Sequence, residues 1–239
     1  MPMCSWVWCR VAVDRGRRQC ADVNDGFGPP GNLLAETGRA VGALGGAVLT
    51  VEVDAVSVER RLALGELSCP GCAGRLGPWG WARRRVLRGS DESTLELTPR
   101  RSRCSLCLVT HVLLPVVALL RRADLAEVIG RAVAAKARGS GARTIAALLG
   151  RPVDTVRGWL RRFASRIESV RRVFTGLLVD VAPDPVVPAV ARTPFADAVA
   201  AVVGAAVAVV ARWPQLGEVP VWQAAAAATG GRLLSPSWP

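Results

Sequence analysis

Residues 142–163 read ARTIAALLGRPVDTVRGWLRRF, and they carry the pattern of two short helices joined by a tight turn. Apolar residues fall on one face of each helix, at Ile145, Ala146 and Leu149 in the first and at Val156, Trp159 and Leu160 in the second. Between them, Gly150 can adopt the positive φ of a sharp turn, and Pro152 suits the start of a helix. The stretch therefore predicts a helix-turn-helix.

The outward face of the second helix is small and basic, as expected of a helix that enters the major groove. We predict DNA contacts from Arg143, Val153, Asp154, Thr155, Arg157, Gly158, Arg161 and Arg162. The alternative is an αα-hairpin in an ordinary helical core. Arg151 departs from the usual pattern, because many helix-turn-helix sequences have an apolar residue just after the turn glycine. It predicts a differently packed turn.

The positive charge is concentrated in the middle of the chain. The 239 residues carry a formal net charge of +12, and 30 of the 31 basic residues are arginine. Residues 69–172 hold 21 basic and seven acidic residues, a net charge of +14, so the remainder is slightly negative. A concentrated basic segment releases counterions when it meets phosphate, which favours double-stranded DNA as the partner. A solvated arginine-rich surface without a partner is the alternative.

Four of the seven cysteines form two CxxC pairs, Cys69 with Cys72 and Cys104 with Cys107. Each pair makes a tight turn with two thiolates directed at one ion, so the two pairs complete a tetrahedral Cys4 site. We therefore predict a zinc ribbon with zinc as the cofactor, in a reducing cytoplasm. A redox dithiol is the weaker alternative, because the pairs lack the βαβ context of a thioredoxin-like motif.

The 31 residues between the two pairs exceed the usual spacing, and a hairpin accounts for the extra length. Trp79 and Trp81 alternate with small residues, residues 94–98 alternate again, and turn-forming residues lie between them. The arginines beside this hairpin either grip phosphate or are merely solvated; they are Arg83, Arg84, Arg85, Arg88, Arg100, Arg101 and Arg103. Leu108 stands where such turns often have glycine, which predicts strain. The only histidine, His111, is expected to be structural rather than a metal ligand.

Further helices are predicted on both sides of these motifs. Residues 50–53 favour a strand, and Val56, Arg60 and Leu64 have the spacing of a short helix after it. Asp124 and Glu127 resemble a capping box that opens another helix. The helical pattern continues after Phe163 to about residue 174. Residues 181–194 form a proline-rich linker, and residues 195–212 and 221–228 read as two Ala-rich helices.

The expected fold is α+β and mostly α: a small Cys4 zinc ribbon, then a three-helix helix-turn-helix domain, then a C-terminal Ala-rich helical segment. The expected boundaries are a disordered leader over residues 1–47, the ribbon with its preceding strand and short helix over 48–117, the helix-turn-helix domain over 118–175, and the linker and C-terminal helices over 176–239. No membrane span is expected, because the uncharged run 198–211 is shorter than the ~20 residues that a span needs.

The CPGC and CSLC pairs, the basic hairpin, THVLLP and RTIAALLGRPVDTVRGWLRRF follow one another in order. In this the chain resembles a bacterial family, of actinobacterial type, that joins a zinc ribbon to a homeodomain-like helix-turn-helix and is similar to the N-terminal regions of insertion-sequence transposases. The resemblance covers about residues 48–174. It implies zinc on the four cysteines and DNA reading by residues 153–162, and it supplies neither a target sequence nor an activity.

These observations predict a DNA-binding protein, either a transcriptional regulator or an accessory protein of transposition. The alternative is a protein-interaction adaptor that docks a polymerase or a transposase without reading DNA directly. A homodimer is compatible with either function. An enzyme is not expected, because the acidic residues after Phe174 lie in or beside a proline-rich linker and Ala-rich helices, and no strands are expected there to hold a catalytic carboxylate triad.

Overall fold

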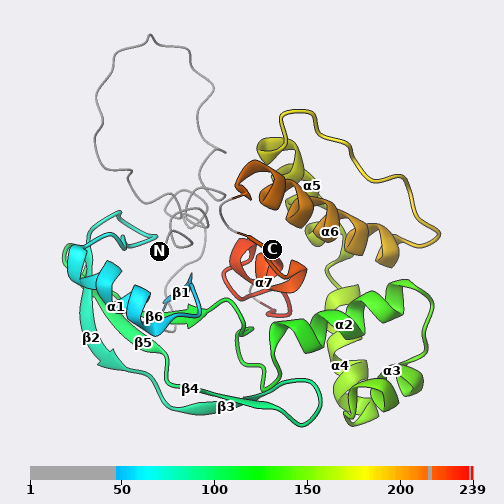
Figure 1. Cartoon of the computed structure of the whole chain (residues 1–239), viewed down its shortest axis with the longest axis horizontal. Coiled ribbons are helices and arrows are strands. Elements are labelled where there is room, and N and C mark those ends of the chain that lie inside the picture. The colour runs from blue at the N-terminus through cyan, green and yellow to red at the C-terminus, as the bar shows by residue number, and fades with distance from the viewer. Residues whose placement is uncertain (1–46, 215–216, 237, 239) are drawn as a thin grey trace.

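The computed structural model describes residues 47–214, 217–236 and 238, and this part of the chain contains six strands and seven helices (Figure 1). The strands are β1 (Ala47–Val51), β2 (Leu76–Trp81), β3 (Arg85–Arg88), β4 (Thr94–Leu97), β5 (Arg100–Cys104) and β6 (Thr110–Pro115). The helices are α1 (Ala55–Leu64), α2 (Ala126–Ala137), α3 (Ala142–Leu149), α4 (Val153–Ala164), α5 (Ile167–Val181), α6 (Pro194–Arg212) and α7 (Val221–Ala228). The leader expected before residue 47 lies outside the described residues.

Four of the strands form a mixed sheet in the order β1-β6-β5-β2. The β1–β6 pair is parallel, whereas β6–β5 and β5–β2 are antiparallel. Parallel neighbours need a long crossover connection, and here it contains α1 and the whole cysteine-bearing segment. Leu49 of β1 and Leu62 of α1 belong to one apolar cluster with Cys69 and Cys104. Cys69 and Cys104 are therefore part of a core, whereas Cys72 and Cys107 are exposed.

The short helix predicted after the first strand is present as α1, and its buried face is not the one that carries Val56 and Leu64. Val56 and Leu64 are 76% and 61% exposed, whereas Val58 and Leu62 are buried. Asp54 caps the N-terminal end of α1, because its carboxylate accepts hydrogen bonds from two backbone N–H groups of the first turn. The sequence has two apolar faces at helical spacing, and contact with the sheet selects between them.

A long antiparallel arm extends from the four-stranded sheet toward the helices (Figure 1). Its base is the β2–β5 pair and its outer part is the two-stranded sheet of β3 and β4. Trp79 and Trp81 were expected to pair with residues 94–98, and this is wrong, because β2 pairs with β5 instead. The arm holds two successive ladders separated by residues 82–84, and alternation alone does not say which two of its four strands pair.

All six helices from α2 to α7 share a single apolar core. It includes Ile129 of α2, Trp159 and Phe163 of α4 and Phe174 of α5, and it extends to Trp238 near the C-terminus. Phe163 also packs on Phe195 of α6, with ring centroids 4.9 Å apart. The C-terminal Ala-rich helices are thus packed into the same core as α3 and α4, not attached after them.

The predicted layout of a zinc ribbon followed by a three-helix domain is therefore wrong, although the protein is α+β. Two features overturn it. The strand around Leu49 joins the sheet beside β6, so the cysteine-bearing segment is enclosed in a mixed sheet with α1. The helices form a six-helix core in which α5 packs on α6, and α6 and α7 pack on α2. Both features depend on contacts between residues far apart in the sequence.

The helix α6 is apolar along most of its length. By length and composition it is the one helix among the described residues that could cross a membrane, and 44% of its apolar window is buried inside the structure. The buried residues include Ala198, Val202 and Ala205, which face the helical core. The sequence predicts a buried helix here, and about half of α6 is packed in that way.

A glycine allows α2 and α7 to approach closely. Gly130 is buried in α2, and a Cβ atom at this position would overlap the indole ring of Trp222 in α7. Relief of this overlap requires either another χ1 rotamer of the buried Trp222 or a shift of α7 away from α2. Gly130 was not singled out from the sequence, because a glycine inside a helical pattern normally only weakens the prediction.

We expect Gly130→Ala to destabilise the protein. Alanine is intrinsically the better helix former by about 1 kcal/mol, but overpacking a rigid contact costs about 1–3 kcal/mol or more. The free energy of unfolding should fall by about 2 kcal/mol in a denaturant titration. Gly204→Ala in α6 is the matched control, because its nearest neighbour would be Pro188 Cγ at 3.2 Å, and the helix propensity of alanine should leave stability unchanged or raise it by up to about 1 kcal/mol. Equal effects of the two variants would contradict the packing argument.

Candidate metal centre and nucleic-acid interface

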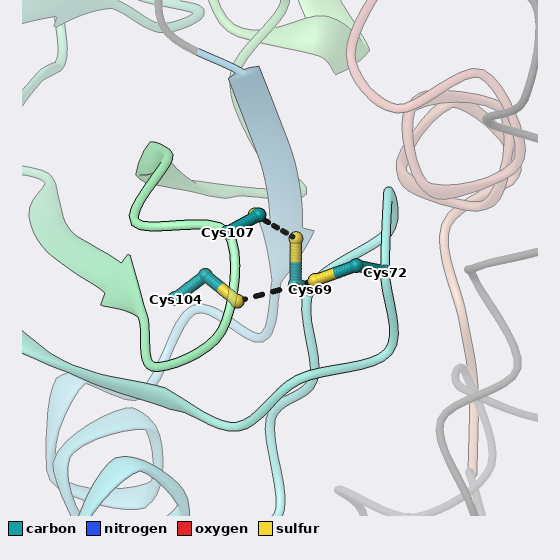
Figure 2. Close-up of side chains that lie close together, drawn as sticks. All are labelled: Cys69, Cys72, Cys104 and Cys107. Carbon is teal, nitrogen blue, oxygen red and sulfur yellow. Dashed lines mark hydrogen bonds between the residues drawn. The ribbon is translucent and has the colours of Figure 1, made fainter.

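Two loops of the four-stranded sheet bring the CxxC cysteines together (Figure 2). Cys69 and Cys72 precede β2, Cys104 ends β5, and Cys107 lies in the turn before β6. The four Sγ atoms lie within 4.8 Å of one another, with 3.6 Å between Cys69 and Cys107 and 3.4 Å between Cys72 and Cys104. A tetrahedral ion with metal–sulfur bonds near 2.3 Å needs sulfur separations of about 3.8 Å. The cysteine group can therefore hold one metal ion.

The two turns have matching backbone geometry. The Cys69 N–H donates to the carbonyl of Gly74, five residues on, at 2.7 Å, and the Cys104 N–H donates to the carbonyl of Val109, also five residues on, at 3.0 Å. The residue after the second cysteine is left-handed in both turns, Ala73 with φ 59° and Leu108 with φ 60°. The strain predicted at Leu108 is present, and Ala73 has the same strain. Two loops of unrelated sequence thus adopt one conformation around the cysteines.

The thiols differ in acidity because their surroundings differ. Burial raises the pKa of Cys69 to about 12. Burial also acts to raise the pKa of Cys104, but hydrogen bonds from the backbone N–H groups of Cys107 and Leu106 and from neighbouring thiols outweigh it and lower the pKa to about 7. A cluster with one readily ionised thiol attracts a cation, and a bound metal ion displaces the remaining thiol protons.

His111 contacts the cysteine group from β6. Its side chain is 2% exposed, and its Nε2 lies 3.3 Å from the Sγ of Cys69. Nδ1 has no hydrogen-bond partner among the described residues, and burial lowers the pKa of the imidazole. A neutral imidazole with its proton on Nε2 can donate to a thiolate at this distance. The apolar run THVLLP gave no sign of this contact, which depends on the β5–β6 pairing.

The residues predicted to contact DNA lie on α3 and α4 and differ in their exposure to solvent. Arg143 lies on the first turn of α3, and the others lie on α4. Four of them are exposed, namely Arg143, Asp154, Arg157 and Arg161, whereas Val153, Thr155 and Arg162 are partly buried. Arg157 is ion-paired with Asp154 at 3.1 Å, one turn away. The exposed face is therefore cationic and narrower than predicted.

Among the residues predicted to contact DNA, Gly158 alone is fully buried. The side chain of Arg162 lies over it, and its Nη1 donates a hydrogen bond to the Gly158 carbonyl at 2.9 Å. The prediction that Gly158 lies on the outward face of the second helix is therefore wrong. A flexible arginine one turn later covers the position, which helical periodicity alone does not reveal.

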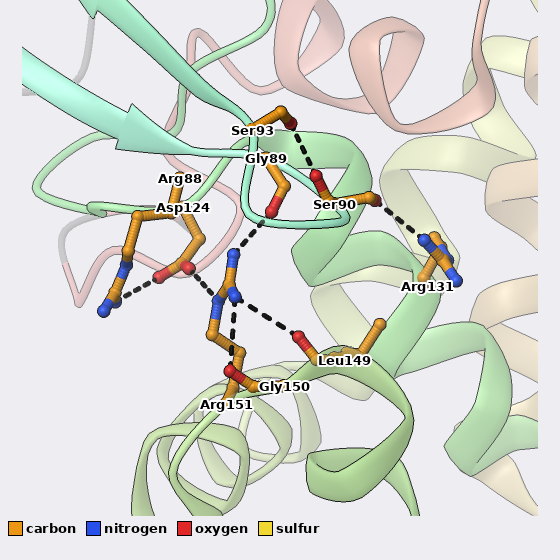
Figure 3. A network of polar contacts seen from close by, with 9 residues as sticks. All are labelled: Arg88, Gly89, Ser90, Ser93, Asp124, Arg131, Leu149, Gly150 and Arg151. Carbon is orange, nitrogen blue, oxygen red and sulfur yellow. Dashed lines mark hydrogen bonds and ion pairs between the residues drawn. The ribbon is translucent and has the colours of Figure 1, made fainter.

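The turn between α3 and α4 is fixed by Arg151, the residue that departs from the usual pattern (Figure 3). Gly150 has φ 59°, and the Arg151 N–H donates to the carbonyl of Ala146 at 3.0 Å. The guanidinium of Arg151 is paired with Asp124 at 2.6 Å and donates to the carbonyl of Gly89 at 2.5 Å. The arginine side chain is only 9% exposed. The differently packed turn predicted from Arg151 is thus a buried polar contact with the tip of the β3–β4 arm.

Asp124 is the centre of this network. It is 2% exposed and accepts a second ion pair from Arg88 of β3 at 2.9 Å. The capping box predicted for Asp124 is wrong, because α2 begins after Leu125 and has no side-chain cap. Arg131 of α2 adds a hydrogen bond to Ser90 in the arm at 2.8 Å (Figure 3). The network therefore ties the arm, α2 and the α3–α4 turn together.

Glu127, the other member of the predicted capping box, is also used elsewhere. It is half-buried, and burial raises its pKa, while a hydrogen bond from the Trp222 backbone N–H and the charge of Arg131 act in the opposite direction. The backbone N–H of Trp222 belongs to the first turn of α7, so Glu127 contacts the N-terminal end of that helix. Both acids of the capping pattern therefore make long-range contacts instead of a local cap.

The arginines along the arm are partly engaged within the protein. Ion pairs join Arg84 to Glu96, Arg88 to Asp124 and Arg100 to Glu59. The guanidinium of Arg103 stacks on Trp79, and that of Arg100 stacks on Trp81. Arg83 and Arg101 are exposed, and Arg85 is partly buried with its pKa lowered by desolvation. The two alternatives for this set, phosphate contact or simple solvation, thus apply chiefly to Arg83 and Arg101.

Comparison with family models, with curated proteins and with solved structures gave no match. The resemblance to the bacterial ribbon and helix-turn-helix family therefore stays a prediction made from motifs. Any function has to be argued from the geometry of the cysteine group, the exposed face of α4 and the surface of the arm.

Proposed function

We propose that this chain binds double-stranded DNA, with α4 as the helix that enters the major groove. The observation that carries the proposal is the two-sided character of α4. Val156, Trp159 and Phe163 anchor one side in the core, while Arg157 and Arg161 are exposed on the other. A helix that is held rigidly and exposes arginines suits base and phosphate contacts.

The connection from α3 supports the same function. Three residues separate the two helices, and the left-handed Gly150 makes the turn, as in DNA-binding helix-turn-helix motifs. Arg143 is exposed at the start of α3, where a phosphate contact would fix the register of α4 on the duplex. The network of Arg151 and Asp124 would hold this turn in place during binding.

We further propose that zinc is the ion of the cysteine group. Four thiolates around one point favour zinc or an iron–sulfur cluster, and four sulfur atoms within 4.8 Å of one another suit a single ion. With all four positions taken by sulfur, the ion would have a structural role. Purified protein should then contain about one zinc per chain.

The biological role that we propose is transcriptional regulation or assistance in transposition, as the family resemblance implies. The target sequence should emerge from selection of bound fragments out of random duplex DNA at moderate salt. A second copy of the chain, a transposase or a polymerase would be the protein partner in such a complex. Cytoplasmic location is part of this proposal, since the free thiols need a reducing compartment.

We expect Arg157→Ala to weaken binding to the selected duplex by about tenfold or more and to relax its sequence preference, because a bidentate base contact contributes about 1–3 kcal/mol. Fluorescence anisotropy at two or more salt concentrations measures the effect. Arg171→Ala is the matched control, because Arg171 of α5 is also 54% exposed and also paired with an acid one turn away. It should change the affinity less than twofold.

Equal affinities of the two variants for the best site would refute the role of α4. The adaptor function would be favoured if a partner protein stays bound after nuclease treatment and the chain binds none of the selected duplexes. Exposed valines that an adaptor would use are present on α6 and the preceding segment, at Val186, Val190, Val203 and Val207.

A further inference from the structure

We propose that the β2–β5 base of the arm is a second nucleic-acid surface, which binds unpaired bases by stacking them on Trp79 and Trp81. Both tryptophans belong to β2, the outermost strand of the four-stranded sheet. They are 52% and 56% exposed. Large flat side chains are seldom left this open on a sheet edge without a partner.

Each ring is held in position by a stacked guanidinium. The Cζ of Arg103 lies 4.4 Å from the ring centroid of Trp79, and the Cζ of Arg100 lies 4.6 Å from that of Trp81. The arginines are themselves anchored: Arg103 Nε donates to the carbonyl of Leu108 at 3.2 Å, and Arg100 pairs with Glu59 at 2.6 Å. One face of each ring is therefore covered and fixed, and the exposed area is left for a planar ligand.

The charge around the two rings identifies the ligand as an anion with planar apolar groups. Residues 75–90 and 97–107 contain eight arginines and no acidic residue. Three of these arginines pair with acids outside the two ranges, Arg84 with Glu96, Arg88 with Asp124 and Arg100 with Glu59. Arg83 and Arg101 are exposed and have no ion-pair or hydrogen-bond partner within the described part of the chain. Stacking aromatics beside free arginines are the features that bind single-stranded nucleic acid. Bases in a duplex are stacked on one another and cannot reach these rings.

This surface is separate from the one proposed for duplex DNA. The tryptophans lie in the sheet beside the cysteine group, whereas Arg157 and Arg161 lie on α4. Arg103 is anchored to Leu108, the residue after Cys107, so the metal-binding turn supports the stacking surface directly. The two activities can therefore be lost independently, and neither proposal depends on the other.

The test measures binding of the full chain to fluorescent oligothymidylate and oligouridylate by anisotropy. The parent should bind at least one of them at low salt. Trp79→Leu/Trp81→Leu, which keeps apolar bulk and removes the stacking rings, should lose about tenfold or more in affinity. Trp79→Phe/Trp81→Phe should retain most of it. Arg157→Ala should bind the single strands like the parent while losing duplex affinity.

Metal content and circular dichroism show whether the leucine variant is folded. If the leucine variant is unfolded, the binding affinity of the phenylalanine variant is compared with that of the parent instead. The proposal is overturned if the parent binds neither single strand, or if the leucine variant binds as well as the parent. It is also overturned if the rings are needed only for binding to anionic phosphatidylserine vesicles, since that would identify a membrane surface as the ligand. The proposal is supported if the parent prefers either single strand and the leucine variant loses this binding.

Discussion

Replacing Cys69 with serine is expected to abolish the metal binding proposed for the cysteine group and to unfold the four-stranded sheet. Cys69 is 1% exposed and belongs to the apolar cluster of β1 and α1, so its loss affects both the ion and the core. Structural zinc supplies folding free energy of about 10 kcal/mol or more in small zinc domains. Because this sheet also has apolar contacts of its own, we expect the free energy of unfolding to fall by at least about 3 kcal/mol.

Thermal and denaturant unfolding, together with metal analysis of the purified protein, measure this effect. Cys20→Ser is the matched control, since it is the same substitution at a cysteine outside the CxxC pairs, and it should leave the metal content unchanged. Removal of the metal from the parent with a strong chelator should reproduce the effect of Cys69→Ser. Parent protein that is purified without metal and is as stable as a metal-loaded sample would refute a structural ion.

Replacing Asp124 with asparagine is expected to destabilise the junction between the arm and the helices. Asparagine keeps the shape of the side chain but removes the charge opposite Arg151, whose side chain is only 9% exposed. A buried charge left without its partner typically costs about 3–5 kcal/mol, because no water replaces the lost interaction. The free energy of unfolding in urea should fall by about that amount.

Asp154→Asn is the matched control for this variant. Asp154 also pairs with an arginine, but its side chain is 92% exposed, so the pair contributes about 0–1 kcal/mol. Combining Asp124→Asn with Arg151→Met should recover part of the lost stability, because the unpaired charge is then gone as well. Equal effects of Asp124→Asn and Asp154→Asn would mean that the network of Figure 3 does not stabilise the fold.

Local patterns in the sequence were sufficient to predict several elements. The apolar spacing around Trp159 predicted α3 and α4, and Gly150 has the left-handed conformation expected of it. The CxxC spacing predicted that four thiols meet, and they lie within 4.8 Å of one another. In each case the signal comes from residues within about one or two turns of each other, where backbone geometry fixes the spacing.

The sequence-based predictions were wrong where a side chain or strand makes its contacts with residues far away in the sequence. Asp124 has the spacing of a helix cap, but Arg88 and Arg151, which lie 36 and 27 residues away, bind it instead. The parallel pairing of Leu49 with Leu113 encloses the cysteines in a mixed sheet, and no local pattern in β1 specifies that neighbour. For the same reason no local pattern predicts the six-helix core, which depends on the packing of α5 on α6 and of α6 on α2.

Burial of the last described residues has a consequence for synthesis of the chain. Leu233, Leu234 and Trp238 are inserted in the core of the helices, and the carbonyl of Gly231 accepts a hydrogen bond from the Leu120 N–H. Since translation proceeds from the N-terminus, α2 to α4 leave the ribosome with part of their apolar surface uncovered until these residues emerge. During that interval the uncovered apolar surface is open to aggregation.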